Sequence, residues 1–277
     1  MSRPLIAFIM CIIMLIFNGC SNDQTAKNEK LSLLEKINKK GKVVIGTDAS
    51  FAPFEFIENG KIVGYGPDIL AEINKNWKVE MEQIDTEWKG ILPGLEAKKF
   101  DFIATAVTVT PERKEKFLLT TPIADSTLLI VINKDYDGIT KEEDIAGKTI
   151  GCSLASSTEK QLLKYNEQLK VEGKPEIILK TYSNYPNMLF DLENRRLDGI
   201  IADGVLLKAA SKNDLEQFKI VDKFKESKYM SWAVRKEDED LLIFLNEELL
   251  KLKKSGKLAE LQEKWFGAAV DLPNELP

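Results

Sequence analysis

The two residues best suited to chemistry in this sequence carry opposite charges, and each follows a short apolar run. Arg113 comes after the apolar residues 102–104 and a segment that begins at Thr108. Its guanidinium is a planar fork of five N–H donors, a shape that suits a carboxylate. Asp203 ends the run 199–202 and could accept hydrogen bonds from an ammonium group. Together the two side chains would fit the two ends of a zwitterion.

Arg113 also has a simpler interpretation, because it lies in the charged stretch 112–116. Such runs are typical of a solvated surface whose members pair with their neighbours. The residue type alone leaves both a surface arginine and a binding arginine open, so the choice depends on the elements that position it.

The composition limits the classes of function. The chain has 277 residues, 44% hydrophobic and 30% charged, so it can bury one large core or two modest ones. A formal net charge of −5, without a basic stripe interleaved with aromatic residues, argues against a nucleic-acid partner. The sequence has no histidine, the commonest catalytic base and metal ligand, and its three cysteines show no metal-ligand spacing. We expect no metal site and no cofactor.

The N-terminal residues are typical of a bacterial export signal. Arg3 supplies a positive charge, residues 5–17 are an unbroken apolar run, and a Gly-Cys pair ending at Cys20 follows. The run is short for a membrane span and suits a signal-peptide core. Because the Gly-Cys pair resembles the bacterial lipobox, we predict a signal peptide over residues 1–20 with lipidated Cys20, and a tether leading into the fold over 21–39. An uncleaved signal anchor is the alternative.

Cleavage before Cys20 would remove Cys11 and leave Cys152 as the only free thiol. No intrachain disulfide would then form, and stability would have to come from packing. Cys152 lies in the strand-like stretch 149–152, where a buried and inert thiol is expected.

From Val43 onward, short β-rich runs alternate with longer helical runs, which is the pattern of βαβ units on a mostly parallel sheet. The predicted strands cover residues 43–47, 78–84, 100–105, 128–132, 148–153, 177–180, 197–202 and 230–234. The predicted helices cover residues 67–76, 90–98, 158–169, 187–194, 205–212, 239–253 and 257–265. The fold class is therefore α/β.

Several segments, taken in order, resemble one protein family. These segments are residues 46–56, 64–69, 88–95, 101–113 and 233–267. They resemble the bacterial solute-binding proteins of family 3, the amino-acid receptors of ABC importers. The resemblance implies a two-lobed periplasmic-binding-protein fold of type II, each lobe a mostly parallel sheet flanked by helices. It divides the chain into lobe 1 (40–130 with 230–277) and lobe 2 (135–225), joined by a two-strand hinge.

The resemblance also implies a ligand site at the carboxyl ends of strands. The predicted site residues are Asp48, Phe51, Trp88, Thr105, Ala106, Thr108, Arg113, Ala155, Ser156, Ser157 and Asp203. In the family pattern Arg113 would clamp an α-carboxylate, helped by Thr108 and by N–H groups at the helix start near Ser157. Asp203 would take the α-ammonium together with acceptors near Thr105.

The remaining site residues have alternative interpretations. The serines before residue 158 also read as a helix cap. Phe51 and Trp88 would cover the alkyl part of an amino acid, and core packing is the less favoured alternative for either ring. Asp48 would face the ligand side chain, which favours a polar or basic amino acid, because a buried carboxylate needs a donor. Ala106 and Ala155 stand where the family often has glycine, and an added methyl group narrows the approach of backbone to ligand.

Three functions remain open at this point. The first is a monomeric lipoprotein receptor on the extracytoplasmic face that captures a free amino acid and passes it to an ABC permease. The second is a dehydratase-like enzyme on the same fold, for which Glu55, Glu87 and Glu159 are candidate acids or bases. The third is an amino-acid sensor that signals through a membrane partner. Because both members of the zwitterion pair are present, we expect a receptor and not an enzyme.

Overall fold

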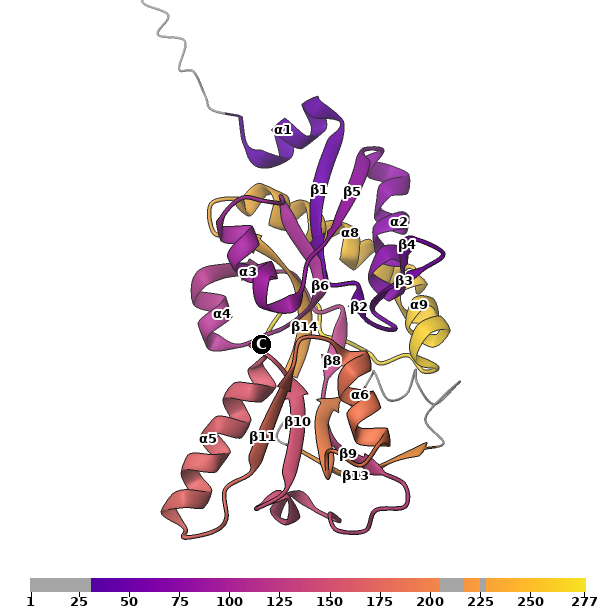
Figure 1. Cartoon of the computed structure of the whole chain (residues 1–277). Helices are drawn as coiled ribbons and strands as arrows, with labels where there is room; N and C mark the ends of the chain where they lie inside the picture. Colours follow the sequence, from indigo (N-terminus) through magenta and orange to yellow (C-terminus); the bar gives the residue numbers. More distant parts are fainter. Residues whose placement is uncertain (1–30, 205–216, 225–227) are drawn as a thin grey trace, which may run out of the picture. The chain divides into compact units, whose positions relative to one another are not determined.

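The described strands form two large sheets and one small sheet. The computed structural model describes residues 31–204, 217–224 and 228–277, so the predicted signal segment with Cys20 and the predicted helix 205–212 lie outside the description. All three sheets belong to the unit Ser32–Pro277 (Figure 1).

The first large sheet has the strand order β5-β1-β6-β14-β7, and β8 pairs with β14. Its strands are β1 (Lys42–Thr47), β5 (Glu80–Asp85), β6 (Phe102–Thr108), β7 (Phe117–Leu119), β8 (Ala124–Ser126) and β14 (Lys228–Arg235). Its helices are α1 (Leu33–Lys40), α2 (Tyr65–Trp77), α3 (Trp88–Glu96), α4 (Pro111–Lys116), α8 (Glu239–Lys254) and α9 (Lys257–Phe266). β1 is parallel to β5 and β6, whereas β14 is antiparallel to β6, β7 and β8.

The second large sheet has the order β11-β10-β12-β9-β13. Its strands are β9 (Leu128–Asn133), β10 (Thr149–Ser153), β11 (Ile178–Tyr182), β12 (Gly199–Asp203) and β13 (Phe218–Lys223). Its helices are α5 (Ser157–Val171), α6 (Tyr185–Glu193) and a 3₁₀ turn at Glu142–Ile145. β10 is parallel to β11 and β12, and β9 is antiparallel to β12 and β13.

Each large sheet thus combines a parallel set with antiparallel strands, where the sequence predicted mostly parallel pairing. The antiparallel strands β9 and β14 are each the first strand after the chain passes from one large sheet to the other, so they do not need the helical crossover that parallel neighbours require. A small antiparallel sheet is built from β2 (Ser50–Phe51), β3 (Glu55–Glu58) and β4 (Lys61–Val63). The residue boundaries proposed for the two lobes stay a prediction.

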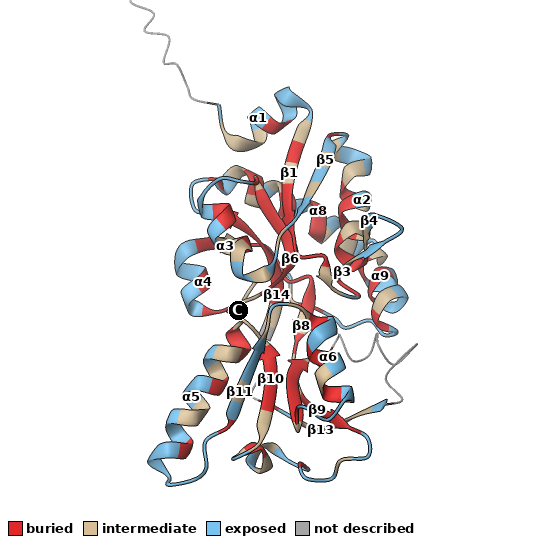
Figure 2. Ribbon diagram, in the orientation of Figure 1, coloured by how far each residue is buried: buried red, intermediate tan, exposed pale blue. Residues whose placement is uncertain are grey.

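Helices cover both faces of the first sheet, and alternate side chains of β6 pack against helices on opposite faces. Phe102 and Ala104 join the apolar cluster with residues of α2, α8 and α9, whereas Ile103 and Val107 join the cluster of α3. Successive residues of a strand point to opposite faces, so a strand buried on both faces reads as one continuous apolar run. Figure 2 shows β6 in red between helices whose outer faces are pale blue.

The second sheet is covered in the same way. Ile150 and Ile201 pack in a cluster with Leu162 of α5, while Ile200 packs in the cluster that contains Met188 of α6. Helix α5 therefore covers one face of the sheet and α6 covers the other. The carboxyl ends of β10, β11 and β12 can carry residues that do not belong to this core.

Cys152 is fully buried on β10, as the sequence predicts. Burial raises the pKa of its thiol to about 12, and the nearby charge of Glu159 acts in the same direction. The thiol is therefore protonated and unreactive at neutral pH.

Candidate functional site

A pocket lies at the carboxyl ends of strands from both large sheets. Its lining includes Asp48 directly after β1, Thr108 at the end of β6, Ser153 at the end of β10, Tyr182 at the end of β11 and Asp203 at the end of β12. Parallel strands direct their carboxyl ends to one edge of a sheet, which is where ligands bind in open α/β folds.

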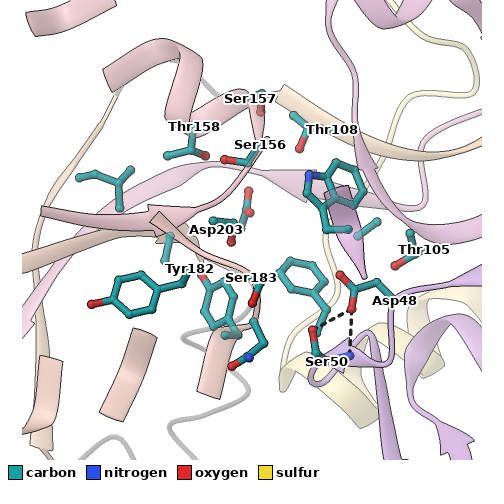
Figure 3. Close-up of a pocket in the computed structure, with 18 of the residues that line it drawn as sticks. Asp48, Ser50, Thr105, Thr108, Ser156, Ser157, Thr158, Tyr182, Ser183 and Asp203 are labelled. Carbon is teal, nitrogen blue, oxygen red and sulfur yellow. Dashed lines mark hydrogen bonds between the residues drawn. The ribbon is translucent and has the colours of Figure 1, made fainter. Parts of the chain in front are cut away.

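All of the predicted site residues except Ala155 line this pocket. They are Asp48, Phe51, Trp88, Thr105, Ala106, Thr108, Arg113, Ser156, Ser157 and Asp203. Figure 3 labels Asp48, Thr105, Thr108, Ser156, Ser157 and Asp203 among them. Ala155 lies beside the pocket, where its carbonyl oxygen accepts a hydrogen bond from Trp88 Nε1 at 3.3 Å. The fold therefore brings these ten residues to one pocket, and their role as ligand contacts stays a prediction.

Arg113 is buried, with only 8% of its surface exposed, so its interpretation as a surface arginine is wrong. The hydroxyl of Thr110 caps α4 by accepting from Arg113 N at 3.3 Å, which places the side chain in the first turn. Arg113 Nη1 donates to Thr108 O at 2.6 Å, and Cζ lies 4.9 Å from the ring centroid of Trp88. Burial lowers the pKa of the guanidinium to about 10, against the nearby charges of Glu112 and Asp203. The group remains charged at neutral pH.

Asp203 presents the opposite charge on the second sheet. Its Oδ1 accepts a hydrogen bond from Ser126 Oγ at 2.6 Å. Removal from water raises the pKa of the carboxyl to about 6; the Ser126 hydrogen bond and the charge of Arg113 oppose that rise, and Asp125 adds to it. At neutral pH the carboxyl of Asp203 is therefore ionised, but only by a small margin between the pH and its pKa.

The start of α5 forms a third part of the wall. Ser156 is the N-cap, and its Oγ accepts from Glu159 N at 3.1 Å. Glu159 Oε2 in turn accepts from Ala155 N at 2.5 Å. The capping interpretation is thus confirmed, and since Ser156 and Ser157 also line the pocket, the same residues have the position to meet an anion.

Ala155 has a left-handed backbone, with φ of 58°. An L-residue with a Cβ is strained there by on the order of 1–2 kcal/mol, which glycine would avoid. In this conformation the carbonyl oxygen of Ala155 accepts the hydrogen bond from Trp88, the first residue of α3 beside the first sheet.

Phe51 forms an aromatic wall. Its ring stacks on Phe54 with centroids 5.3 Å apart and planes at 15°, and it meets Tyr185 edge-on at 5.5 Å and 74°. Phe54 itself is fully buried core. Because Phe51 and Trp88 both line the pocket, neither ring is only a core residue.

Asp48 is held by its neighbour Ser50, whose N and Oγ both donate to Asp48 Oδ1, at 3.1 and 2.7 Å (Figure 3). Burial raises the pKa of Asp48; the Ser50 hydrogen bonds oppose this, and Asp85 reinforces it. A carboxyl in this position gains from a further donor, which a ligand side chain would supply.

The candidate acid–base residues Glu55, Glu87 and Glu159 are absent from the lining of this pocket. Glu55 is fully buried and accepts from Thr105 Oγ1 at 2.7 Å, with burial raising its pKa well above the usual range. Glu87 pairs with Lys89 at 2.9 Å, and Glu159 holds the backbone of Ala155.

Sequence reasoning missed one whole side of the pocket. The overlooked lining residues are Ser50, Ser153, Thr158, Tyr182, Ser183, Asn184, Tyr185, Ile201 and Ala202. The segment 182–185 joins β11 to α6, and the side chain of Asn184 caps this helix by accepting from Asn187 N at 3.0 Å. An asparagine followed two residues later by proline is a helix-start signal, and it would have moved the predicted helix start back from Asn187.

The described residues hold neither a metal-binding cluster nor a membrane-spanning helix. Across the ranges 31–204, 217–224 and 228–277, no group of histidine, cysteine, aspartate and glutamate side chains is arranged to hold a metal ion. In the same ranges, no helix has the length and apolar character needed to cross a membrane.

Comparisons with known proteins agree with this geometry. L-cystine-binding protein TcyJ of Escherichia coli (strain K12) is 30% identical over 240 residues, covering 86% of this chain and 87% of the relative. The arginine-binding extracellular protein ArtP of Bacillus subtilis (strain 168) is 29% identical over 231 residues, covering 82% of this chain and 87% of the relative. The solved structure of holo ArgBP from T. maritima has a TM-score of 0.71 and 33% identity, covering 83% of this chain and 98% of that one.

Such structural neighbours share the α/β architecture described above, so the chain has the two-lobed type II fold expected from its sequence. Residues 43–268 match the sequence profile of the bacterial extracellular solute-binding proteins, family 3, which covers most of the chain. The chain therefore belongs to the bacterial extracellular solute-binding proteins of family 3.

Proposed function

We propose that this protein captures a free amino acid in the pocket and delivers it to the membrane permease of an ABC importer. The observation that carries the proposal is the placement of buried Arg113 and of Asp203 in one pocket, the first beside α4 and β6 and the second at the end of β12. A guanidinium and a carboxylate on separate walls match the carboxylate and ammonium of an amino acid. The homology to cystine-binding and arginine-binding proteins supports this class of ligand.

The two-lobed fold supplies the mechanism of capture. Each charged residue is carried by a different sheet, so an open form would hold only one end of the zwitterion. A ligand that meets both ends has much higher affinity for the closed form and shifts the population toward it. The permease would then recognise the closed, loaded form.

The proposed ligand is a polar or basic amino acid. Asp48 accepts two hydrogen bonds from Ser50, and its carboxylate has the capacity for a further donor, which a side-chain amide, ammonium or guanidinium would supply. Phe51 and Trp88 would cover the alkyl part of that side chain. Arginine and cystine, named for the relatives, both carry a nitrogen donor at the far end.

The proposal also includes the cell location. A signal peptide over residues 1–20 and a lipidated Cys20 would hold a monomeric receptor at the extracytoplasmic face of a bacterial membrane, with the segment after Cys20 as tether. More than one acyl chain on this cysteine would be needed for stable attachment.

The protein acts as a receptor and not as an enzyme in this proposal. The three candidate acid–base glutamates do not line the pocket, so the residues named for the dehydratase alternative are not placed to act on a bound ligand. A sensor would bind the same ligand in the same way, and only its membrane partner would differ.

The test is to purify the mature chain from cells without refolding and to identify the co-purifying small molecule by mass spectrometry. Titration calorimetry of the stripped protein with the twenty amino acids would follow. We expect one polar or basic L-amino acid in both experiments. Absence of binding by every amino acid would refute the proposal.

A further inference from the structure

Ser126 lies at the point where the chain passes from the first large sheet to the second. It is the last residue of β8 in the first sheet, and β9 of the second sheet begins two residues later at Leu128. The residue is buried, and it is not among those that line the pocket. A buried hydroxyl needs a hydrogen-bond partner, because leaving it unpaired is unfavourable.

The partner of the Ser126 hydroxyl is the pocket residue Asp203. Ser126 Oγ donates to Asp203 Oδ1 at 2.6 Å, a distance typical of a hydroxyl that donates to a charged oxygen. Backbone pairing fixes this neighbourhood, because Asp203 pairs with Leu128 between β12 and β9. The next residue, Gly204, donates from its N to Thr127 O at 2.7 Å. The register of the second sheet therefore places the serine hydroxyl beside the carboxylate.

The charge of Asp203 depends on this contact. Removal from water raises the pKa of the carboxyl to about 6, and the Ser126 hydrogen bond is the strongest influence in the opposite direction. The other titratable groups that interact with Asp203, among the described residues, are Asp125 of β8, Arg113 of α4 and Tyr185 of α6. Asp125 raises the pKa of Asp203, and Arg113 lowers it less than the serine does. The phenol of Tyr185 is neutral, because burial raises its own pKa well above the usual range.

We propose that Ser126 is a positioning residue, whose hydroxyl keeps the carboxylate of Asp203 ionised and fixed for the ammonium group of the ligand. The inference rests on the proposed function, which assigns Asp203 to that ammonium. Ser126 acts through Asp203: its O–H donates to the ionised carboxylate and stabilises the charged form over the protonated one. The ammonium site is thereby tied to the strand that leaves the first sheet.

The test compares Ser126→Ala with the natural chain by titration calorimetry, with L-arginine and L-glutamine as probes. Alanine removes the hydroxyl and adds no bulk. A hydrogen bond to a charged group is worth more than one to a neutral group, so the pKa of Asp203 should rise by about one unit. For whichever probe the natural chain binds, the dissociation constant of the variant should be about tenfold higher at about pH 5 and nearly equal at about pH 8.

The pH dependence separates this role from a structural one. The hydrogen bond to ionised Asp203 is present with and without ligand, so its loss changes affinity only where the carboxyl becomes protonated. Damage to the fold or to the alignment of the pocket would weaken binding at every pH. Burial also raises the pKa of Asp48, but that group titrates in both proteins, so the ratio of the two dissociation constants isolates Asp203.

The matched control is Ser231→Ala, the same substitution at a buried serine in β14, the strand that pairs with β8. Ser231 Oγ has no hydrogen-bond partner among the described residues. Its removal should therefore leave both the affinity for the probes and the pH profile unchanged. A pH profile altered equally by both substitutions would overturn the inference, because the effect would then not depend on the contact with Asp203.

A second measurement needs no ligand. A ¹³C NMR titration of the aspartate carboxyl groups, with Asp203→Asn to assign the signal, gives the pKa of Asp203 in the natural chain and in Ser126→Ala. We expect a rise of about one unit in the variant. An unchanged pKa, or a loss of affinity of equal size at about pH 5 and about pH 8, would overturn the inference. If the natural chain binds neither probe nor any other amino acid, the proposed function fails, and the titration still decides whether Ser126 controls the charge of Asp203.

Discussion

Replacement of Arg113 by methionine should abolish most amino-acid binding while leaving the fold almost as stable as before. Methionine keeps the unbranched apolar stem against Trp88 and removes the charge. Loss of the guanidinium leaves a desolvated ligand carboxylate without its partner, which costs about 2–5 kcal/mol. The dissociation constant should therefore rise by about 30-fold to several thousandfold.

The expected change in stability follows from opposing effects of similar size. Burial lowers the pKa of Arg113 to about 10, so the charged form is disfavoured by about 3 kcal/mol in the folded protein, and methionine removes this cost. Methionine also loses the hydrogen bond to Thr108 O, worth about 1.5–3 kcal/mol, and the contact over Trp88, worth about 0.5–2 kcal/mol. The free energy of unfolding should change by no more than about 2 kcal/mol.

A second buried arginine provides the control. Arg235 is 7% exposed; its Nη1 donates to Phe100 O at 2.7 Å, and its Nε lies 2.6 Å from Asp238 Oδ2. Because Arg235→Met strands a buried carboxylate, it should destabilise the protein by about 3–5 kcal/mol without changing affinity. Calorimetry and thermal unfolding of both variants give the result. Unchanged affinity in Arg113→Met, or a large loss of affinity in Arg235→Met, would refute the site.

Four further outcomes are expected. Affinity for the amino acid should weaken as the pH falls through about 6, by about tenfold per pH unit below it, because the ligand ammonium needs ionised Asp203. The variant Asp203→Asn should bind more weakly at neutral pH, and its affinity should change little with pH. The same pH profile in both proteins would contradict the assignment of Asp203 to the ammonium. Asp48→Ala should weaken the preferred polar ligand and narrow its advantage over leucine in a thermal-shift screen. Ala155→Gly should relieve the left-handed strain and so increase the free energy of unfolding by up to roughly 1–2 kcal/mol, less the cost of the greater chain entropy of glycine. The thermal midpoint should rise accordingly, and a clear fall of the midpoint would contradict the strain. Cys20→Ser should release the protein from the membrane fraction, whereas continued attachment would indicate an uncleaved anchor.

The sequence predicted the parts of this fold that carry strong local patterns. Strands such as β6, which is buried on both faces, appear as unbroken apolar runs, and helices such as α8 show an apolar stripe, so both were located to within a few residues. Elements of two or three residues, such as β2 and β7, were missed because such short strands have no periodicity. The antiparallel partners β9 and β14 are set by tertiary pairing, which apolar runs do not encode.

The candidate site divides in the same way. Arg113 and Asp203 were found because the resemblance to the family supplied a role for each, whereas the charge of Arg113 alone left a surface position open. Tyr182 and Tyr185 were missed because an aromatic residue near a strand end is equally typical of core packing. Their place on the pocket wall depends on how β11 leads into α6, a geometry that appears only when the sheet is assembled.

The burial of Cys152 makes this protein a convenient scaffold for an optical biosensor. In a chain that starts after Cys20, it is the only cysteine, and its thiol is both inaccessible and protonated at neutral pH. A single cysteine placed at an exposed position beside the pocket, such as Glu87 next to Trp88, would then react alone with a fluorescent maleimide. No background thiol would need to be removed from the core, and the emission of one dye could report on ligand capture.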